Sequence, residues 1–188
     1  PWYAAANVNF RTQFADGYNL PNDSVKVSTL MAPGYLVAGL GFKYEKNDDF
    51  RFLVTPVTVK TVFVLDDFLS AQGAYGVDTL TNSRSEFGAF ISFFYKKEVV
   101  KNVTVTTLYT MFGNYSQLAS WDINWDLIID FKVNDWLSAN LTTNLIYDQD
   151  IAIPVDRTGD GVKESFGPRV QFRQALGIGL VAKFDSFR

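Results

Sequence analysis

The sequence predicts an all-β protein, a transmembrane up-and-down antiparallel β-barrel with eight strands in this chain. Three observations predict it: apolar and polar residues alternate over long segments, short and long connections alternate, and aromatic residues gather where the segments end. Alternation with period two is typical of strands whose two faces meet different surroundings. Residues 1–188 are expected to form one domain, because nothing in the composition marks a boundary.

The alternation is clearest in the first, sixth, seventh and last segments. In the seventh, Leu137, Leu141 and Leu145 share one face, whereas Asn140 and Asn144 lie on the other. Most segments are ten or more residues long, about what a tilted strand needs to cross a hydrocarbon layer, whereas strands of globular proteins are usually shorter. The predicted strands are 2–13, 34–45, 50–65, 86–97, 102–113, 122–133, 137–148 and 171–184.

The connections between these segments differ in length in a regular way. In chain order they are 15–33, 45–49, 66–85, 98–101, 115–120, 134–136 and 150–168. Short and longer connections alternate, so the tight turns fall at one end of the sheet and the longer loops at the other, as in outer-membrane barrels. We therefore expect the bacterial outer membrane as location, with the short turns and the C-terminus in the periplasm and the long loops outside.

A soluble ligand-binding β-barrel is an alternative, because soluble barrels alternate too. The apolar rows of the four clearest segments carry no charge, and a Lys or Arg facing lipid costs roughly 2–4 kcal/mol at mid-depth. Aromatic rings suit both membrane interfaces. Those at the segment ends are Trp2, Phe14, Tyr44, Tyr95, Phe112, Tyr115, Trp121, Trp136, Tyr147 and Phe184. A transmembrane helix is excluded, because the apolar runs are only a handful of residues long.

The composition excludes several function classes. The chain has no Cys and no His, so thiol and imidazole chemistry are absent, and we do not expect an enzyme. The net charge is −3 and no basic block occurs, which argues against a nucleic-acid partner. The expected partners are outer-membrane lipid and, through the long loops, other outer-membrane proteins.

Charged residues on the polar faces of the segments predict a charged lumen. These candidates are Arg11, Glu86, Lys96, Asp122, Asp126, Asp130, Lys132 and Arg173. Such a set either forms an ion-paired plug or selects ions and small polar solutes. The plug is favoured, because eight closed strands leave little open cross-section. The predicted function is that of a structural or accessory barrel whose long loops receive partners or ligands; the alternative is a small polar solute or ion channel.

One loop contains a partial calcium-binding pattern. Asp156, Thr158 and Asp160 place oxygen atoms at alternate positions before a glycine, and Glu164 follows at the ninth position. Gly167 occupies the twelfth position, where a closing Glu is expected. A solvent-exposed turn explains the same residues, so calcium is the weaker interpretation and no other cofactor is expected.

Motifs spread over nearly the whole chain carry a resemblance to a known family. Examples are Gln13-Phe14-Ala15-Asp16-Gly17-Tyr18, Met31-Ala32-Pro33-Gly34-Tyr35-Leu36, Glu86-Phe87-Gly88-Ala89, Tyr95-Lys96-Lys97-Glu98 and Gly167-Pro168-Arg169. With them the chain resembles an uncharacterised outer-membrane β-barrel family of the Gram-negative Bacteroidetes, a domain of unknown function. The resemblance implies about four further strands before Pro1, so that these would be the last eight of about twelve, the C-terminal two thirds. The family has no established activity, so no residue role is transferred.

Overall fold

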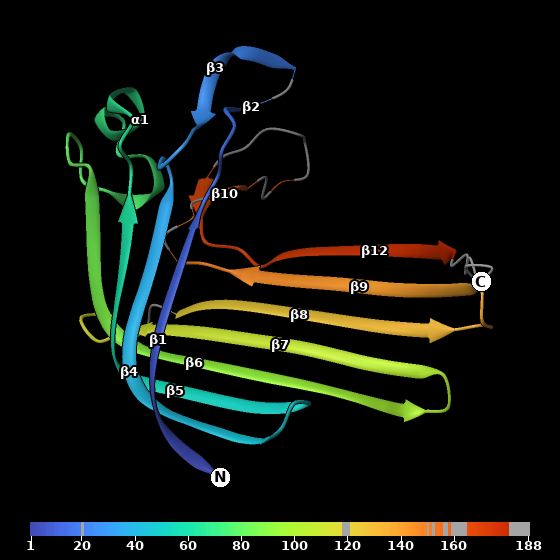
Figure 1. The fold of residues 1–188 in the computed structure, drawn as a ribbon. Coiled ribbons are helices and arrows are strands. Elements are labelled where there is room, and N and C mark those ends of the chain that lie inside the picture. Colours follow the sequence, from blue (N-terminus) through green and yellow to red (C-terminus); the bar gives the residue numbers. More distant parts are fainter. Residues whose placement is uncertain are drawn as a thin grey trace, which may run out of the picture.

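The computed structural model describes residues 1–19, 21–117, 121–149, 151, 153–155, 158 and 165–180. Eight of its strands form one antiparallel sheet in the order β1-β4-β5-β6-β7-β8-β9-β12 (Figure 1). They are β1 (Trp2–Thr12), β4 (Gly34–Asn47), β5 (Phe50–Phe63), β6 (Ser83–Val100), β7 (Val103–Asn114), β8 (Trp121–Lys132), β9 (Leu137–Tyr147) and β12 (Gln171–Leu180). The eight predicted segments and their antiparallel order are confirmed.

The longer connections contain short elements of their own. β2 (Gly17–Asn19) pairs with β3 (Asn22–Ser28), and β10 (Ile153–Val155) pairs with β11 (Ser165–Gly167). The connection after β5 forms the helix α1 (Asp67–Ala71) and the 3₁₀ turn η1 (Ala74–Gly76). In the part of the chain that the structure describes, no helix is long and apolar enough to span a membrane.

The buried apolar side chains gather at the loop end of β5. Val62 and Val64 contact Leu69 of α1, together with Ala32 and Val77, and all of them are buried. Figure 1 shows α1 and the β2–β3 hairpin at this same end of the sheet. We call this group of elements the cap. Burying these side chains removes apolar surface from water, which stabilises the cap against the end of the sheet.

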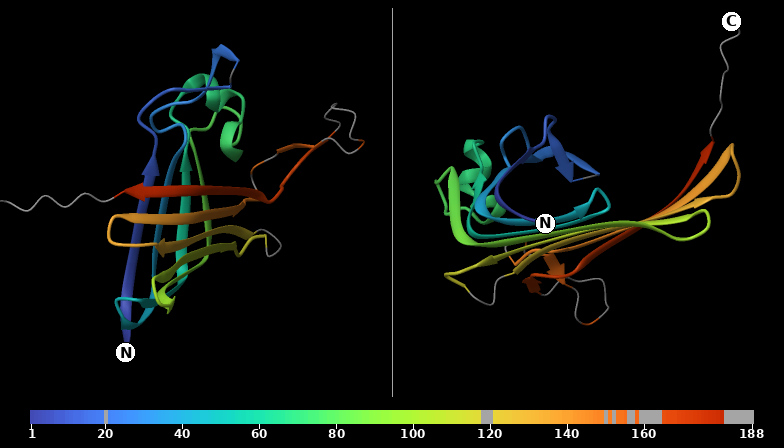
Figure 2. Two further views of the ribbon diagram at one scale, coloured as in Figure 1. Left: turned by 90° about the vertical axis from the view of Figure 1, so that its right-hand side faces the viewer. Right: turned by 60° about the horizontal axis from the view of Figure 1, so that its bottom comes forward.

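The sheet is open, which corrects the prediction that these eight strands close into a barrel. β1 and β12 form its two edges and do not pair with each other. Figure 2 shows that the sheet curls strongly around β1, β4 and β5 but extends away from them toward β12. The strand ladders explain the difference. Within the sheet, pairing is irregular at Leu40–Phe42 of β4 and Thr55–Thr58 of β5, whereas β7–β8, β8–β9 and β9–β12 are regular, and bulges increase local bending and twist.

The bulge in β5 lies between Thr55 and Thr58 and accommodates Pro56, which cannot donate a ladder hydrogen bond. Both threonine side chains are fully buried, and their hydroxyl oxygens lie 2.8 Å apart. On the neighbouring strand, a Cβ added to Gly41 would lie 2.0 Å from the Val54 carbonyl oxygen, so only glycine fits beside the bulge.

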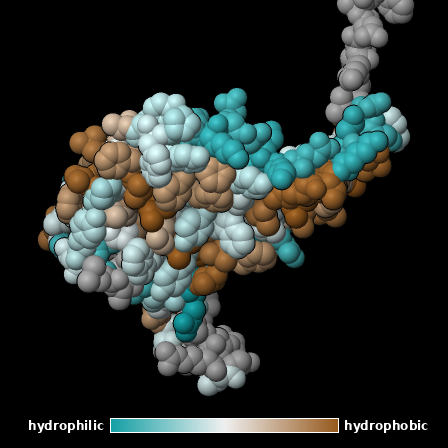
Figure 3. All heavy atoms as spheres, turned by 90° about the horizontal axis from the view of Figure 1, so that it is seen from below, coloured by the Kyte–Doolittle hydropathy of each residue, from teal (hydrophilic) through white to brown (hydrophobic). Residues whose placement is uncertain are grey.

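The pairing register places the apolar rows of all eight strands on one face, which we call the outer face. Ala6 aligns with Leu40 and Val57, and at the other edge Leu176 aligns with Leu141. On the arm formed by the C-terminal strands, hydrophobic side chains cover one face and hydrophilic ones the opposite face (Figure 3). Exposed residues of the outer face are Val8, Phe10, Leu40, Phe42, Val57, Val59, Phe87, Trp125, Phe131, Phe172, Leu176, Ile178 and Leu180.

Aromatic rings form a continuous chain at the turn end of the outer face. Trp2 contacts Tyr44, Tyr44 contacts Phe50, and Phe50 contacts both Phe93 and Tyr95, with ring centroids 5.3–6.2 Å apart. Edge-to-face and tilted contacts at these separations stabilise aromatic pairs. The chain joins β1, β4, β5 and β6 at one level across the sheet.

Candidate functional site

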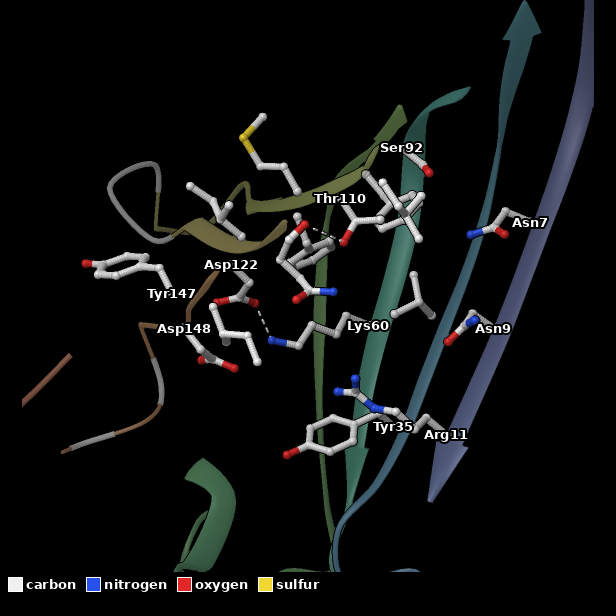
Figure 4. Close-up of a pocket in the computed structure, with 18 of the residues that line it drawn as sticks. Asn7, Asn9, Arg11, Tyr35, Lys60, Ser92, Thr110, Asp122, Tyr147 and Asp148 are labelled. Atoms are coloured by element: carbon white, nitrogen blue, oxygen red, sulfur yellow. Dashed lines mark hydrogen bonds and ion pairs between the residues drawn. The ribbon is translucent and has the colours of Figure 1, made fainter. Parts of the chain in front are cut away.

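The face opposite the outer face is concave and polar, and it contains a hollow of about 460 Å³. Polar and apolar side chains from β1, β4, β5, β6, β7, β8 and β9 line it. The charged residues among them are Arg11, Lys60, Asp122 and Asp148. Figure 4 shows these side chains converging on the hollow, three from separate strands and Asp148 from the segment after β9. The hollow is the candidate site, because it is a concavity with few convergent polar groups.

Lys60 of β5 lies at the centre of an ion-pair network. Its ammonium group forms a close ion pair with Asp122 and lies 3.4 Å from Glu86 Oε2. Arg84 also lies 3.4 Å from Glu86 Oε2, and Asn114 donates a 2.7 Å hydrogen bond to Glu86 Oε1. Lys60 is 7% exposed. A buried charge is tolerated only when it is paired and hydrogen-bonded. The network meets this condition for Lys60 and joins side chains of β5, β6, β7 and β8.

Arg11 of β1 occupies a different position in the hollow. Its guanidinium lies over the ring of Tyr35, 5.0 Å from the centroid, and both residues line the hollow. Cation–π contact holds the group in place without neutralising it. Among the described residues, no carboxylate forms an ion pair with Arg11.

The structure places all eight predicted lumen residues on the concave face, as the registers require. Arg11 and Asp122 line the hollow, and Glu86 belongs to the Lys60 network. Asp126 lies further along β8 and accepts a 2.7 Å hydrogen bond from Asn144. The other four are exposed and lie apart from the hollow: Lys96, Asp130, Lys132 and Arg173.

Lys60, the most buried charged residue of the site, was not among the residues predicted from the sequence. Before the bulge, odd-numbered residues of β5 such as Arg51 face the concave side; after it, even-numbered residues such as Lys60 do. This change of parity breaks the period-two pattern on which the prediction depended. Pro56 inside a strand was the available signal, because proline within a sheet is confined to edges and bulges.

The predicted calcium loop lies mostly outside the described residues. This holds for Asp156, Asp160 and Glu164, whereas Thr158 is described and exposed. Within the described ranges, no group of three or more acidic side chains could hold a metal ion. Calcium at this loop therefore stays a prediction.

The cap lies at the loop end, and polar contacts join its two segments. Lys26 of β3 pairs with Asp66, the N-cap residue of α1, at 2.6 Å, and the Tyr75 hydroxyl donates a 2.7 Å hydrogen bond to the Val27 carbonyl. The hydrogen bond from Lys26 holds the pKa of Asp66 below its ordinary value, and the same bond raises the pKa of Lys26. Burial raises the pKa of Tyr75. The shifts of Asp66 and Lys26 mean that the contact between these two residues is strongest when both are charged.

No protein-family model matches the chain, and no curated protein or solved structure matches it either.

Proposed function

We propose that the chain is part of an integral outer-membrane β-barrel protein of structural or accessory type. The outer face carries this proposal. Its apolar rows run across all eight strands, and many of their side chains are exposed; Leu176 and Ile178 are each 75% exposed. Between the turns and the loops these rows carry no charged residue, and Lys97 continues the row of β6 only at the turn end. A face of this size suits hydrocarbon better than water.

Strand length and aromatic placement support the same proposal. Every strand of the large sheet has at least ten residues, from 10 in β12 to 18 in β6, which is sufficient for a tilted strand to cross a bilayer. The ring chain from Trp2 to Tyr95 lies at a single level of the outer face. Tyr and Trp at such a level are typical of the membrane–water interface.

The ion pairs of the concave face favour a structural or accessory role over a pore. The carboxylates of Glu86 and Asp122 are paired with Lys60 and Arg84 in direct contacts, so these charges are not presented to passing solutes. Barrels without an open path act through their loops and surfaces. The loop end offers exposed apolar side chains for protein partners, among them Tyr18, Val25, Leu30, Phe68 and Leu80.

The two sheet edges set a requirement for the assembled protein. Unpaired backbone groups each cost several kcal/mol in hydrocarbon, so β1 and β12 need pairing partners in a membrane. Further strands before Pro1, which the family resemblance implies, would meet this requirement. On this proposal the eight strands described are the last part of a larger barrel.

The direct test is expression of the full-length protein in a Gram-negative host. Intact cells are treated with protease, and membranes are fractionated. We expect recovery in the outer-membrane fraction, extraction only by detergent, and cleavage confined to the loop end, for example between 66 and 85. Recovery in the soluble fraction without detergent would overturn the proposal and favour a soluble ligand-binding β-barrel.

A small polar solute channel is the second candidate, and the hollow of about 460 Å³ favours it. Planar-bilayer recordings of the purified full-length protein separate the two candidates. Stable openings would make the hollow part of a solute path. A correctly inserted protein without openings would support the accessory role.

A further inference from the structure

A second pocket lies at the turn end of the sheet, apart from the hollow. It has a volume of about 300 Å³ and lies where the β4–β5 turn approaches β6. The Lys96 amide donates a 2.8 Å hydrogen bond to the Asp49 carbonyl and so fixes this approach. Figure 1 shows the turn at the end of β4 and β5 that lies away from the cap. We call it the turn-end pocket, and the lining residues that matter below are Lys46, Asp49, Phe50, Tyr95, Lys96 and Lys97.

The turn-end pocket is cationic. Three lysines and one carboxylate, that of Asp49, give its lining residues a formal charge of +2. Among the residues that the structure describes, none forms an ion pair with these three lysines, which are all exposed. Other lysines at the same end of the sheet are paired, Lys43 with Glu45 and Lys132 with Asp135. The pocket therefore presents positive charge that an anionic ligand can neutralise.

Two aromatic rings relate the pocket to the outer face. Phe50 and Tyr95 line it and also belong to the ring chain at the turn end. In a membrane, Tyr and Trp rings at such a level lie among the lipid headgroups. Beyond these rings the outer face continues with Phe52 and Phe93, which are aligned in the register of β5 and β6. A lipid at this place would have its polar end beside the lysines and its apolar chains along this row.

We propose that the turn-end pocket binds the headgroup phosphate of an anionic phospholipid, of the class of phosphatidylglycerol. The inference rests on the proposed membrane location, in which the ring chain lies at the level of the headgroups. The ammonium groups of Lys46, Lys96 and Lys97 pair with the phosphate, because each is a compact charge on a long, flexible side chain. Basic pockets beside membrane-spanning segments bind anionic headgroups. Phosphatidylcholine gains less, because the same lysines repel its choline group.

The test is native mass spectrometry of the full-length protein released from detergent micelles. Either dioleoyl-phosphatidylglycerol or dioleoyl-phosphatidylcholine is added, and the dissociation constant of each is measured. The two lipids share their acyl chains and their phosphate but differ in the net charge of the headgroup. We expect phosphatidylglycerol to bind at least about tenfold more tightly. Equal binding of the two lipids would overturn the proposal.

Inorganic phosphate distinguishes a lipid site from a site for free phosphate. Added at the same concentration as phosphatidylglycerol, it should leave the lipid bound, because it lacks acyl chains to contact the outer face. Displacement of the lipid under these conditions would overturn the proposal in favour of a free-anion site.

A triple variant connects the preference with the pocket. Its substitutions are Lys46→Gln, Lys96→Gln and Lys97→Gln, and it should bind the two lipids within about twofold of each other. The matched control removes the same charge at the same end of the sheet but outside the pocket, by Lys43→Gln, Lys101→Gln and Lys132→Gln. The control should keep the preference, and circular dichroism verifies the β-structure of both variants. A control that loses the preference as the first variant does would contradict the assignment to this pocket.

Asp49→Asn tests the same site in the opposite direction. It removes the carboxylate from the lining and should tighten phosphatidylglycerol binding, a gain that misfolding would not produce. Unchanged or weaker binding would contradict the proposal. Membrane fractionation separates this proposal from the proposed function. A protein recovered in the outer membrane without a lipid preference contradicts the lipid site alone, whereas a protein recovered in the soluble fraction contradicts both.

Discussion

Two regions of the sheet bury their side chains in different ways. One is the loop end of β4, β5 and β6, and the other consists of the later strands β8, β9 and β12. Around β5 the structure has a small core, with Val64 fully buried, and an ion-pair network around Lys60. Among the described residues after Asn114, none is buried. The first region therefore has a stabilising interior of its own, whereas the second depends on whatever covers its faces. In the proposed setting lipid covers the outer face.

Removal of the Lys60 charge, in the region with an interior of its own, should cause the largest loss of stability. In Lys60→Ala the carboxylates of Glu86 and Asp122 lose their shared cation in a buried place, and breaking such a pair costs roughly 3–5 kcal/mol. Lys132→Ala is the control, because its pair with Asp135 is exposed and should contribute less than about 1 kcal/mol. Denaturant unfolding in detergent measures both. Equal losses for the two variants would contradict the distinction between the regions.

A charge introduced on the outer face of β9 should cause the next largest loss of stability. Leu141 faces outward between Ile129 and Leu176, whereas Thr142 faces the concave side. Leu141→Arg is expected to destabilise the protein folded in lipid vesicles by roughly 2–4 kcal/mol, because the charge would face hydrocarbon. Thr142→Arg, one residue further, should cost clearly less. If the two variants fold into vesicles equally well, lipid does not cover this face.

A smaller effect is expected from the contact between the two parts of the cap. Tyr75→Phe removes the hydrogen bond to the Val27 carbonyl and should destabilise the docking of the hairpin by about 0.5–1.5 kcal/mol. Hydrogen exchange of the amides of β3 reports this opening. Tyr115→Phe removes a bond of the same length to the Pro56 carbonyl, away from the hairpin, and should leave that exchange unchanged.

The smallest effect is expected from pH acting on the pair of Lys26 and Asp66. The pKa of Asp66 is lowered from 3.8, so its contribution is present above that pH and is lost as pH falls through the lower folded value. The pKa of Lys26 is raised from 10.5, so its contribution is present below that pH and is lost as pH rises further. The protection of the hairpin amides, taken relative to their intrinsic exchange rate at each pH, should therefore be greatest between these limits.

Asp66→Asn is the variant that isolates this charge effect. The asparagine side chain can still accept the hydrogen bond from the Leu69 amide at the start of α1, but it carries no charge for Lys26. The loss of protection in β3 at acid pH should be smaller in this variant. An unchanged acid dependence would place its origin in other groups.

The sequence was sufficient for the strands and their faces, because period-two alternation depends only on which side of each strand is apolar. It predicted the rows of β8 and β9 residue by residue, and those strands pair without irregularities. It did not predict the open sheet, because curvature depends on bulges and on edge partners that alternation does not encode. Lys60 was missed for the same reason, since the bulge before it changes the side of every later residue of β5.

The contacts of the cap were beyond sequence reasoning for another physical reason. The connections 15–33 and 66–85 have no periodicity, so nothing in them indicates that Lys26 meets Asp66 or that Tyr75 meets Val27. Apolar residues such as Leu69 and Val77 were visible in the sequence, but their partners Val62 and Val64 come from the end of a strand. The family resemblance stays a prediction.

The direction of the edge strands constrains any complete assembly of this sheet. Each strand runs antiparallel to its neighbour from β1 through to β12, so the two edges run in opposite directions. Strands added between them by antiparallel pairing must therefore come in pairs, as whole hairpins. A single inserted strand would run parallel to one of its neighbours. A closed, fully antiparallel assembly of this sheet therefore has an even number of strands.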